Sequence, residues 1–407
     1  MTPRVERAEV VVVGAGPAGS ALAGELAARG RKVLLVDRRL FPRAKPCGEC
    51  VSPGGVHALR RLGLSGAVEG TGPVPLGGWS LSTPSGARAW AAFPRSERGW
   101  GVDRGTFDAA LLGEARRRGA RVIEGVHVRR VATGCAEELP RAWGVGAGGE
   151  EWCLTGSVLV GADGLRSVVA REIGALRRRP RLRKVSLTWR VRGTGPPDDR
   201  GHLLLGGEVT VGLAPVPSPG GERNRWNATL VVDAGRLGRE LPERGWDLLT
   251  RGLEFLTGAW ASGPVACDGP WASGPFDWST DRVCKDRVVL VGDAAGYYDP
   301  LTGQGIYRAL RGAELAAGVI DGALVSRGSP PRWPVAAGGL EGIGLSTFAE
   351  TVGGAFTAGE RVQRMIEGVL SRPTLREPAL SLLGWSPRAS SLLAGIVGDV
   401  PTRRPCA

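Results

Sequence analysis

The sequence is poor in the residues that build metal centres and hydrolytic sites. It contains 3 His in 407 residues, and they stand far apart at positions 57, 127 and 202. Zinc sites, Ser-His-Asp triads and Cys-His pairs all need a His together with further ligands or a nucleophile. We therefore expect no metal site and no hydrolytic centre, and we expect structural roles for the three His.

Long apolar runs and a disulfide framework are also absent. No stretch of about 18 apolar residues occurs, so no segment is expected to span a membrane. The 7 Cys are odd in number and widely spaced, which is typical of reduced thiols. The first residues, MTPRVERAEVVVV, lead into an apolar strand without a signal peptide. A cytoplasmic protein is expected, while contact with the surface of a membrane stays open.

Lysine is scarce as well, because it occurs only at positions 32, 45, 184 and 285. The net charge of +13 is therefore carried by Arg. These Arg are scattered, and the densest run, at 177–184, falls at an expected domain junction, so no nucleic-acid partner is expected. The content of 42% hydrophobic and 23% charged residues is typical of a globular protein, and the length is sufficient for two domains.

What is present begins with a glycine-rich turn. Residues 9–13 predict a short apolar strand, residues 14–19 (GAGPAG) follow, and then come a helix and a second strand that ends at Asp37. In this context GxGxxG is typical of a site for a dinucleotide, either FAD or NAD. The residues expected to bind its adenosine and pyrophosphate are Gly14, Gly16, Pro17, Ala18, Gly19, Asp37 and Arg38.

The next loop carries Cys47 and Cys50, for which three explanations compete. A metal pair lacks a second CxxC or a pair of His. A redox disulfide, as in pyridine-nucleotide disulfide reductases, needs a second nucleotide fingerprint. The candidate for it, residues 144–149 (GVGAGG), precedes an alternating segment and is expected to be a hairpin turn. We favour a loop that lines a flavin, with Gly48 permitting close approach. Two small buried thiols are the alternative.

A second strand-loop-helix unit lies at residues 287–310. A buried strand ends at Gly292-Asp293, a loop runs to Pro300, and Gly303-Gln304-Gly305 opens a helix with one apolar face. A carboxylate beside a free helix N-terminus suits a ligand that carries hydroxyl groups and negative charge. The partial positive charge at such a helix end, here Gly305 and Ile306, would stabilise a reduced flavin.

These segments together resemble one superfamily. The motif PxxxxCG at 42–48 is similar to the segment near the flavin in the geranylgeranyl reductase family. That family belongs to the flavoproteins that resemble para-hydroxybenzoate hydroxylase, which also include monooxygenases and flavin halogenases. Residues 104–108 (RGTFD), 160–167 (VGADGLRS) and 292–305 resemble three further motifs of this superfamily, and they occur in its order.

The resemblance implies an FAD cofactor with NAD(P)H as the electron donor. It implies that Arg104 and Asp163 contact FAD and that Asp293 binds the ribityl chain. Pro300, Gly303, Gly305 and Ile306 would lie at the flavin ring. Cys47 and Glu49 are the candidate catalytic residues.

The middle of the chain changes pattern. From 184 to 233, alternating segments separated by Gly/Pro-rich turns predict an antiparallel sheet, which in the superfamily carries the substrate pocket. The expected fold is thus an α/β protein with a Rossmann-type FAD-binding domain (1–75, 101–180, 281–325), an interleaved antiparallel-sheet substrate domain (76–100, 181–280) and a helical C-terminal region (326–407). That last region is expected to pack on the FAD domain.

Two departures bear on function. The YxWxFP signature of isoprenoid reductases is reduced to its proline at Val209–Pro215, and the WxWxIP of halogenases is absent. We therefore expect a monooxygenase that hydroxylates or epoxidises a small, largely apolar molecule, such as an aromatic, polyketide or prenylated compound of specialised metabolism. A reductase of isoprenoid double bonds is the alternative, and a non-enzymatic carrier of the same fold is a more distant one.

Overall fold

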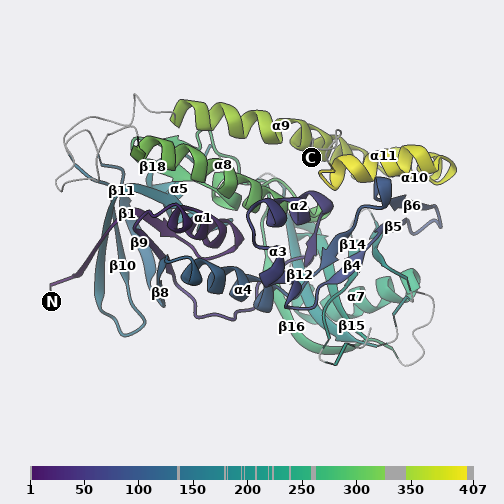
Figure 1. Cartoon of the computed structure of the whole chain (residues 1–407). Helices are drawn as coiled ribbons and strands as arrows, with labels where there is room; N and C mark the ends of the chain where they lie inside the picture. The colour runs from purple at the N-terminus through teal and green to yellow at the C-terminus, as the bar shows by residue number, and fades with distance from the viewer. Residues whose placement is uncertain are drawn as a thin grey trace.

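The computed structural model describes residues 2–134, 138–177, 180, 182–193, 195–196, 198–206, 209–218, 220–221, 224–237, 240–257, 263–325 and 345–400. Two sheets lie side by side, and helices run along them (Figure 1). Residues 326–344 and 401–407 of the predicted C-terminal region lie outside the described residues. The α/β fold with a Rossmann-type domain, an antiparallel sheet and C-terminal helices is confirmed.

An eight-stranded sheet forms the first layer, with the order β17-β18-β11-β1-β2-β8; β10 also pairs with β11, and β9 pairs with β10. The pairs β1–β2, β1–β11, β2–β8 and β11–β18 are parallel, as expected of a dinucleotide fold. The predicted hairpin turn at 144–149 is confirmed, because it joins β10 to β11 in antiparallel pairing. The strands are β1 (Arg4–Val13), β2 (Val33–Asp37), β8 (Arg121–Glu124), β9 (His127–Ala132), β10 (Arg141–Val145), β11 (Glu151–Gly161), β17 (Cys284–Lys285) and β18 (Val288–Leu290).

Both faces of this sheet are covered, which explains why β1 is apolar at every position from Val10 to Val13. Val10 and Val12 join the core beneath the helices α1 (Pro17–Ala28), α4 (Arg104–Arg117) and α8 (Gly305–Val325). Val11 and Val13 face the opposite core, formed with the β9–β10 hairpin and α5 (Val168–Glu172). The helix α8, predicted from its spacing, packs on α1.

A seven-stranded sheet forms the second layer, with the order β16-β12-β15-β14-β13-β5-β6. All its pairs are antiparallel except β13–β5. The helix α7 (Leu241–Thr257), which the sequence patterns did not predict, packs its Leu249 and Leu253 on the outer face. The strands are β5 (Gly78–Ser82), β6 (Arg88–Ala92), β12 (Lys184–Arg192), β13 (Arg200–Leu205), β14 (Val209–Pro215), β15 (Arg225–Asp233) and β16 (Val265–Ser273).

Short elements join the two layers. The strands β3 (Cys50–Val51), β4 (Val74–Leu76) and β7 (Gly99–Gly101) form a small sheet. The other short helices are α2 (Pro53–Arg61), α3 (Ser65–Glu69) and α6 (Ala234–Leu237). Three 3-10 turns are η1 (Pro94–Ser96), η2 (Gly292–Ala295) and η3 (Pro300–Thr302). The predicted domain boundaries stay a prediction.

The C-terminal helices pack on both layers. The helix α9 (Leu345–Leu370) runs along α8 of the FAD-binding layer (Figure 1). The helices α10 (Pro373–Trp385) and α11 (Pro387–Val397) pack on β6 of the second sheet. Within the described ranges, no helix combines the length and apolarity needed to cross a membrane.

Candidate active site

A pocket of about 1420 Å³, counted with its part open to solvent, lies between the two sheets. Its walls come from the first turn of α1, the loop of Cys47, the start of α8 and the inner face of the second sheet. Eleven of the predicted site residues line it: Gly16, Pro17, Ala18, Cys47, Glu49, Arg104, Asp293, Pro300, Gly303, Gly305 and Ile306. Gly14 precedes them at the start of the glycine-rich turn.

The glycine-rich turn has a shape that other residues would not allow. Gly14 has φ +105°, and a Cβ there would lie 2.4 Å from the carbonyl oxygen of Ala162. A Cβ on Gly19 would lie 1.8 Å from the carbonyl oxygen of Gly14, so the helix and the turn meet through this glycine. Gly16 differs, because the nearest atom to a Cβ there is Nη2 of Arg43, at 3.7 Å. The space beside Gly16 is therefore open to a ligand.

The start of α1 fits a pyrophosphate. Its N-cap is Gly16, which offers no side-chain acceptor to the first N–H groups, and the first turn contains no acidic residue. A helix N-terminus with free N–H groups attracts phosphate oxygens. Arg43 adds a guanidinium beside Gly16; burial lowers its pKa, and the carboxylate of Asp108 opposes this. Arginine keeps its charge in proteins.

Asp37, at the end of β2, accepts hydrogen bonds from two backbone N–H groups. One carboxylate oxygen of Asp37 accepts from the N–H of Ala15 (2.7 Å) and the other from the N–H of Arg39 (2.8 Å). Each oxygen keeps a further lone pair, so the carboxylate can still receive a ribose hydroxyl. Arg38 is exposed and does not line the pocket. The binding roles of both residues stay predictions.

Asp163 supports the helix α5. Its carboxylate accepts from the hydroxyl of Ser167 (2.5 Å) and from the N–H groups of Val168 (2.6 Å) and Val169 (3.3 Å). Burial raises the pKa of Asp163, and these hydrogen bonds oppose the rise. The neighbours Gly164 and Leu165 line the pocket instead. The predicted contact of Asp163 with FAD thus stays a prediction, and its contacts in the structure stabilise the fold.

The other end of the pocket has the charge pattern expected near a flavin. Asp293 lies in η2, after Gly292, whose φ of +61° lets the chain turn sharply toward α8. Gly305 and Ile306 begin α8, whose first turn has no acidic residue. Lys45 lines the same space, and burial lowers the pKa of its ammonium group, although Asp293 opposes this. The residues present therefore fit the ribityl chain and ring of a flavin.

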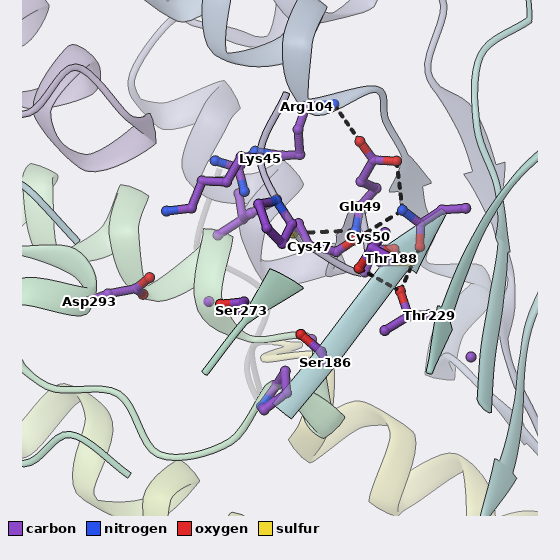
Figure 2. Close-up of a pocket in the computed structure, with 18 of the residues that line it drawn as sticks. Lys45, Cys47, Glu49, Cys50, Arg104, Ser186, Thr188, Thr229, Ser273 and Asp293 are labelled. Atoms are coloured by element: carbon purple, nitrogen blue, oxygen red, sulfur yellow. Dashed lines mark hydrogen bonds between the residues drawn. The ribbon is translucent and has the colours of Figure 1, made fainter. Parts of the chain in front are cut away.

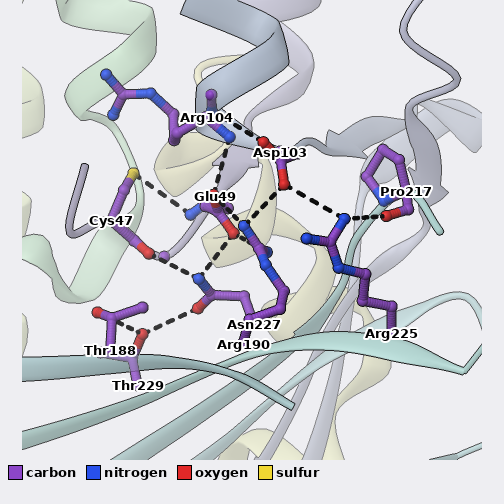
Figure 3. Close-up of polar contacts among 12 residues, drawn as sticks. Cys47, Glu49, Asp103, Arg104, Thr188, Arg190, Pro217, Arg225, Asn227 and Thr229 are labelled. Carbon is purple, nitrogen blue, oxygen red and sulfur yellow. Dashed lines mark hydrogen bonds and ion pairs between the residues drawn. The ribbon is translucent and has the colours of Figure 1, made fainter. Parts of the chain in front are cut away.

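A buried network fixes the loop of Cys47 to the second sheet (Figure 3). Glu49 is 3% exposed and has φ +55°, in the region that favours glycine. Its carboxylate accepts from two Nη atoms of Arg190 on β12 and from Nδ2 of Asn227 on β15 (2.9 Å). It also accepts from the N–H of Arg104 at the start of α4 (2.8 Å). These contacts occupy the carboxylate with protein donors and give Glu49 a positioning role, so its predicted catalytic role stays untested.

The network continues on both sides of Glu49. Arg190 also pairs with Asp103 (3.1 Å), the N-cap of α4, and Arg225 lies 3.5 Å from the same carboxylate. Asn227 donates a second hydrogen bond to the carbonyl oxygen of Cys47 (3.0 Å). Two carboxylates and two guanidinium groups thus balance one another where the two layers meet.

The two cysteines of the loop have different surroundings. The sulfur of Cys47 accepts a hydrogen bond from the N–H of Glu49 (3.3 Å), and Cys47 is half-buried at the wall of the pocket. Cys50 is 7% exposed at the start of β3, and burial raises the pKa of its thiol. Both are free thiols. Among the described residues, no group of His, Cys, Asp and Glu could hold a metal ion.

Arg104 is buried beside the same loop. Its guanidinium donates to both oxygens of Asp108 (2.8 Å each), one helical turn further along α4. Burial lowers the pKa of Arg104, but Asp108 and Cys47 raise it more strongly, so the residue stays charged. Arg104 therefore brings a fixed positive charge to the wall of the pocket.

The inner face of the second sheet carries polar site residues that were not predicted from the sequence. Ser186, Thr188 and Arg190 alternate along β12, and Asn227 and Thr229 alternate along β15. Figure 2 shows the hydroxyl groups of this face on one side of the pocket, with Lys45 and Asp293 across from them. The signal was present in the sequence, because Leu187, Trp189 and Val191 alternate with the polar residues and lie in the core under α7.

This fold and pocket define a flavin-dependent oxidoreductase, and comparison with known proteins agrees. The FAD binding domain family matches residues 7–320. The digeranylgeranylglycerophospholipid reductase of Methanothrix thermoacetophila is 32% identical over 341 residues, which are 79% of this chain and 79% of that protein. The menaquinone reductase of Mycobacterium tuberculosis is 31% identical over 374 residues, covering 84% of this chain and 82% of that one.

Solved structures share the fold. A flavoprotein/dehydrogenase from Cytophaga hutchinsonii superposes with a TM-score of 0.80 at 19% identity, covering 97% of this chain and 93% of that chain. The chain therefore belongs to the FAD binding domain family, within the superfamily that resembles para-hydroxybenzoate hydroxylase. Its resemblance to this superfamily, its nature as an FAD-dependent oxidoreductase and its FAD cofactor, all predicted from the sequence, are confirmed.

Proposed function

We propose that the protein is an FAD-dependent reductase that saturates carbon–carbon double bonds of a largely apolar, prenyl-type substrate, with NAD(P)H as the electron donor. The observation that carries the proposal is the position of the Cys47 thiol, which lies at the wall of the pocket that also contains Asp293 and Ile306. Two relatives, 32% and 31% identical to this chain over most of its length, are reductases, and their names specify digeranylgeranylglycerophospholipid and menaquinone.

Saturation of one double bond takes two electrons and two protons. When FAD is bound and reduced by NAD(P)H, it would supply a hydride, which carries both electrons and one of the two protons. The N–H of Glu49 donates to the sulfur of Cys47 and would hold the thiol in place, so that its S–H could give the second proton to the other carbon of the double bond. The first turn of α8 would stabilise negative charge on the cofactor, and Lys45 adds a cation to the same space.

A second candidate is the monooxygenase expected from the sequence. The observation in its favour is the strand Val209–Pro215, which lacks the aromatic residues of the isoprenoid reductase signature. The inner face of the second sheet is also rich in hydroxyl groups, which suits a more polar substrate than a hydrocarbon chain. In this alternative, oxygen is the co-substrate, and one of its atoms enters the product.

The test is the fate of a reduced flavin under argon. The FAD-loaded protein is photoreduced and mixed anaerobically with geranylgeraniol, and the absorption of oxidised flavin is followed. We expect the band to return without oxygen, and we expect no return with the fully saturated alcohol. A band that returns only after oxygen is admitted, with ¹⁸O from ¹⁸O₂ in the product, would favour the monooxygenase instead.

A further inference from the structure

We propose that Thr229 accepts a hydrogen bond from a hydroxyl group of the substrate, so that the substrate is an apolar molecule with an O–H group near the reacting bond. The proposal rests on the proposed function in one respect, namely that the substrate enters this pocket. Thr229 lies on β15, is half-buried and lines the pocket beside Thr188 and Ser186 (Figure 2).

The direction of the hydrogen bonds around Thr229 follows from the buried network. Nδ2 of Asn227 lies within hydrogen-bond distance of the Cys47 carbonyl oxygen (3.0 Å) and the Glu49 carboxylate (2.9 Å). Both partners are acceptors, so this atom must be the NH₂ group of the amide. The amide oxygen of Asn227 therefore faces Thr229, and the Thr229 hydroxyl has to donate to it (2.9 Å).

Thr229 has no second proton to offer. Its oxygen keeps two lone pairs, and the Thr188 hydroxyl, 3.3 Å away across the strand pair, can donate to one of them. Thr188 is 2% exposed, whereas Thr229 is open to the pocket. The remaining lone pair of Thr229 thus meets the ligand as an acceptor, and it selects for an O–H or N–H group over an ether or a hydrocarbon.

The neighbouring surface explains the mixed character of the substrate. Val231, two positions after Thr229 on the same face, and Leu203 and Phe276 add apolar area to the pocket. The hydroxyl acceptor is therefore one polar point on a wall that can bind a hydrocarbon chain. A prenyl alcohol or a prenylated phenol has this combination of groups.

The test compares three probes of matched shape on the oxidised, FAD-loaded protein: geraniol, geranyl methyl ether and the hydrocarbon in which a methyl group replaces the hydroxyl. Their dissociation constants are measured from the change in flavin absorption, so no turnover is required. We expect geraniol to bind between a few-fold and about tenfold more tightly than the other two, the size of one net hydrogen bond. The preference should persist in T229S and disappear in T229V.

The control variant is T250V, which makes the same change on α7, the helix that covers the opposite face of the sheet. It should retain the preference for geraniol. A preference that survives in T229V, equal binding of the three probes to the wild type, or no binding of any of them would overturn the proposal. If T229V no longer binds FAD, the affinities of the three probes for the wild type and for T229A test the proposal instead. A failure here leaves the argon test of the reductase unaffected, which separates the two proposals.

Discussion

Arg190 and Glu49 form a buried ion pair that joins the second sheet to the loop of the pocket. Nη2 of Arg190 lies 2.8 Å from one carboxylate oxygen of Glu49, and Nη1 contacts the other. The residues are 4% and 3% exposed. Because Glu49 directly follows Cys47-Gly48, the pair determines where the Cys47 thiol lies relative to the strands β12 and β15.

Removal of one partner should therefore be costly. In R190M the carboxylate of Glu49 stays buried without its counter-charge, and we expect the free energy of unfolding to fall by about 3–5 kcal/mol. Urea denaturation of the FAD-loaded protein measures this. The matched control is R251M, whose Arg pairs with Asp247 on the surface of α7 and should change stability by about 0–1 kcal/mol. Equal effects of the two variants would contradict a structural role for the Glu49 pair.

The open space at Gly16 predicts a variant that folds but binds FAD poorly. A Cβ at Gly16 meets no protein atom closer than 3.7 Å, so G16A should keep the thermal stability of the FAD-free protein. The methyl group would occupy space needed by the pyrophosphate, and we expect the dissociation constant for FAD to rise about tenfold or more. G66A, where a Cβ meets nothing within 4 Å, should bind FAD like the wild type.

The two cysteines of the loop should differ in their effect on the reaction. Because the Cys47 sulfur lies at the wall of the pocket, C47A should slow double-bond reduction by about 10²-fold, the lower range for loss of a general acid. Cys50 also lines the pocket, but its thiol is buried and donates to the carbonyl oxygen of Gly48 (3.2 Å), and burial raises its pKa. C50A should therefore leave the rate within a few-fold. Rapid-mixing experiments under argon measure both rates. Equal rates for C47A and the wild type would exclude Cys47 as the proton donor.

A carboxyl group near the end of the described chain should make stability depend on pH. Asp399 accepts from Nε2 of Gln304 (2.7 Å), and burial raises its pKa well above the usual range despite this bond. A raised pKa in the folded state means that its contribution to stability is complete below the unfolded-state pKa and is lost as the pH rises through the folded-state pKa.

The variant D399N should remove this dependence. Asn accepts the same bond from Gln304 and tolerates the φ of +54° at this position. We expect D399N to unfold at a higher temperature than the wild type at neutral and alkaline pH, with the difference shrinking in acid. D247N, at an exposed site on α7, is the control. Parallel profiles for D399N and the wild type would contradict the raised pKa.

The sequence predicted the parts of the site that depend on local order along the chain. The turn at Gly14–Gly19 and the Asp293 loop each combine a strand, glycines and a helix start within about 20 residues, so their geometry is encoded where they stand. The antiparallel strands of the second sheet were also visible as alternation. The fold could be predicted for this reason.

The positioning network could not be predicted in the same way. Glu49 meets Arg190 across 141 positions of the chain, and the contact depends on the register that sets Arg190 opposite Asn227. Alternation shows that these side chains share a face, but it does not show which sheet face turns toward the loop. In the structure, Leu249 and Leu253 of α7 cover the apolar face of the sheet, and the polar face therefore turns toward the loop.

One single-turnover measurement tests the central claim most directly. The FAD-loaded protein is reduced with one equivalent of dithionite under argon and then mixed with an excess of geranylgeraniol. The mass of the product is measured by mass spectrometry. We expect one saturated double bond, a gain of two hydrogens, for each FAD, and formation of this product about 10²-fold more slowly in C47A. Unchanged geranylgeraniol under argon, with an added oxygen atom once air is admitted, would contradict it.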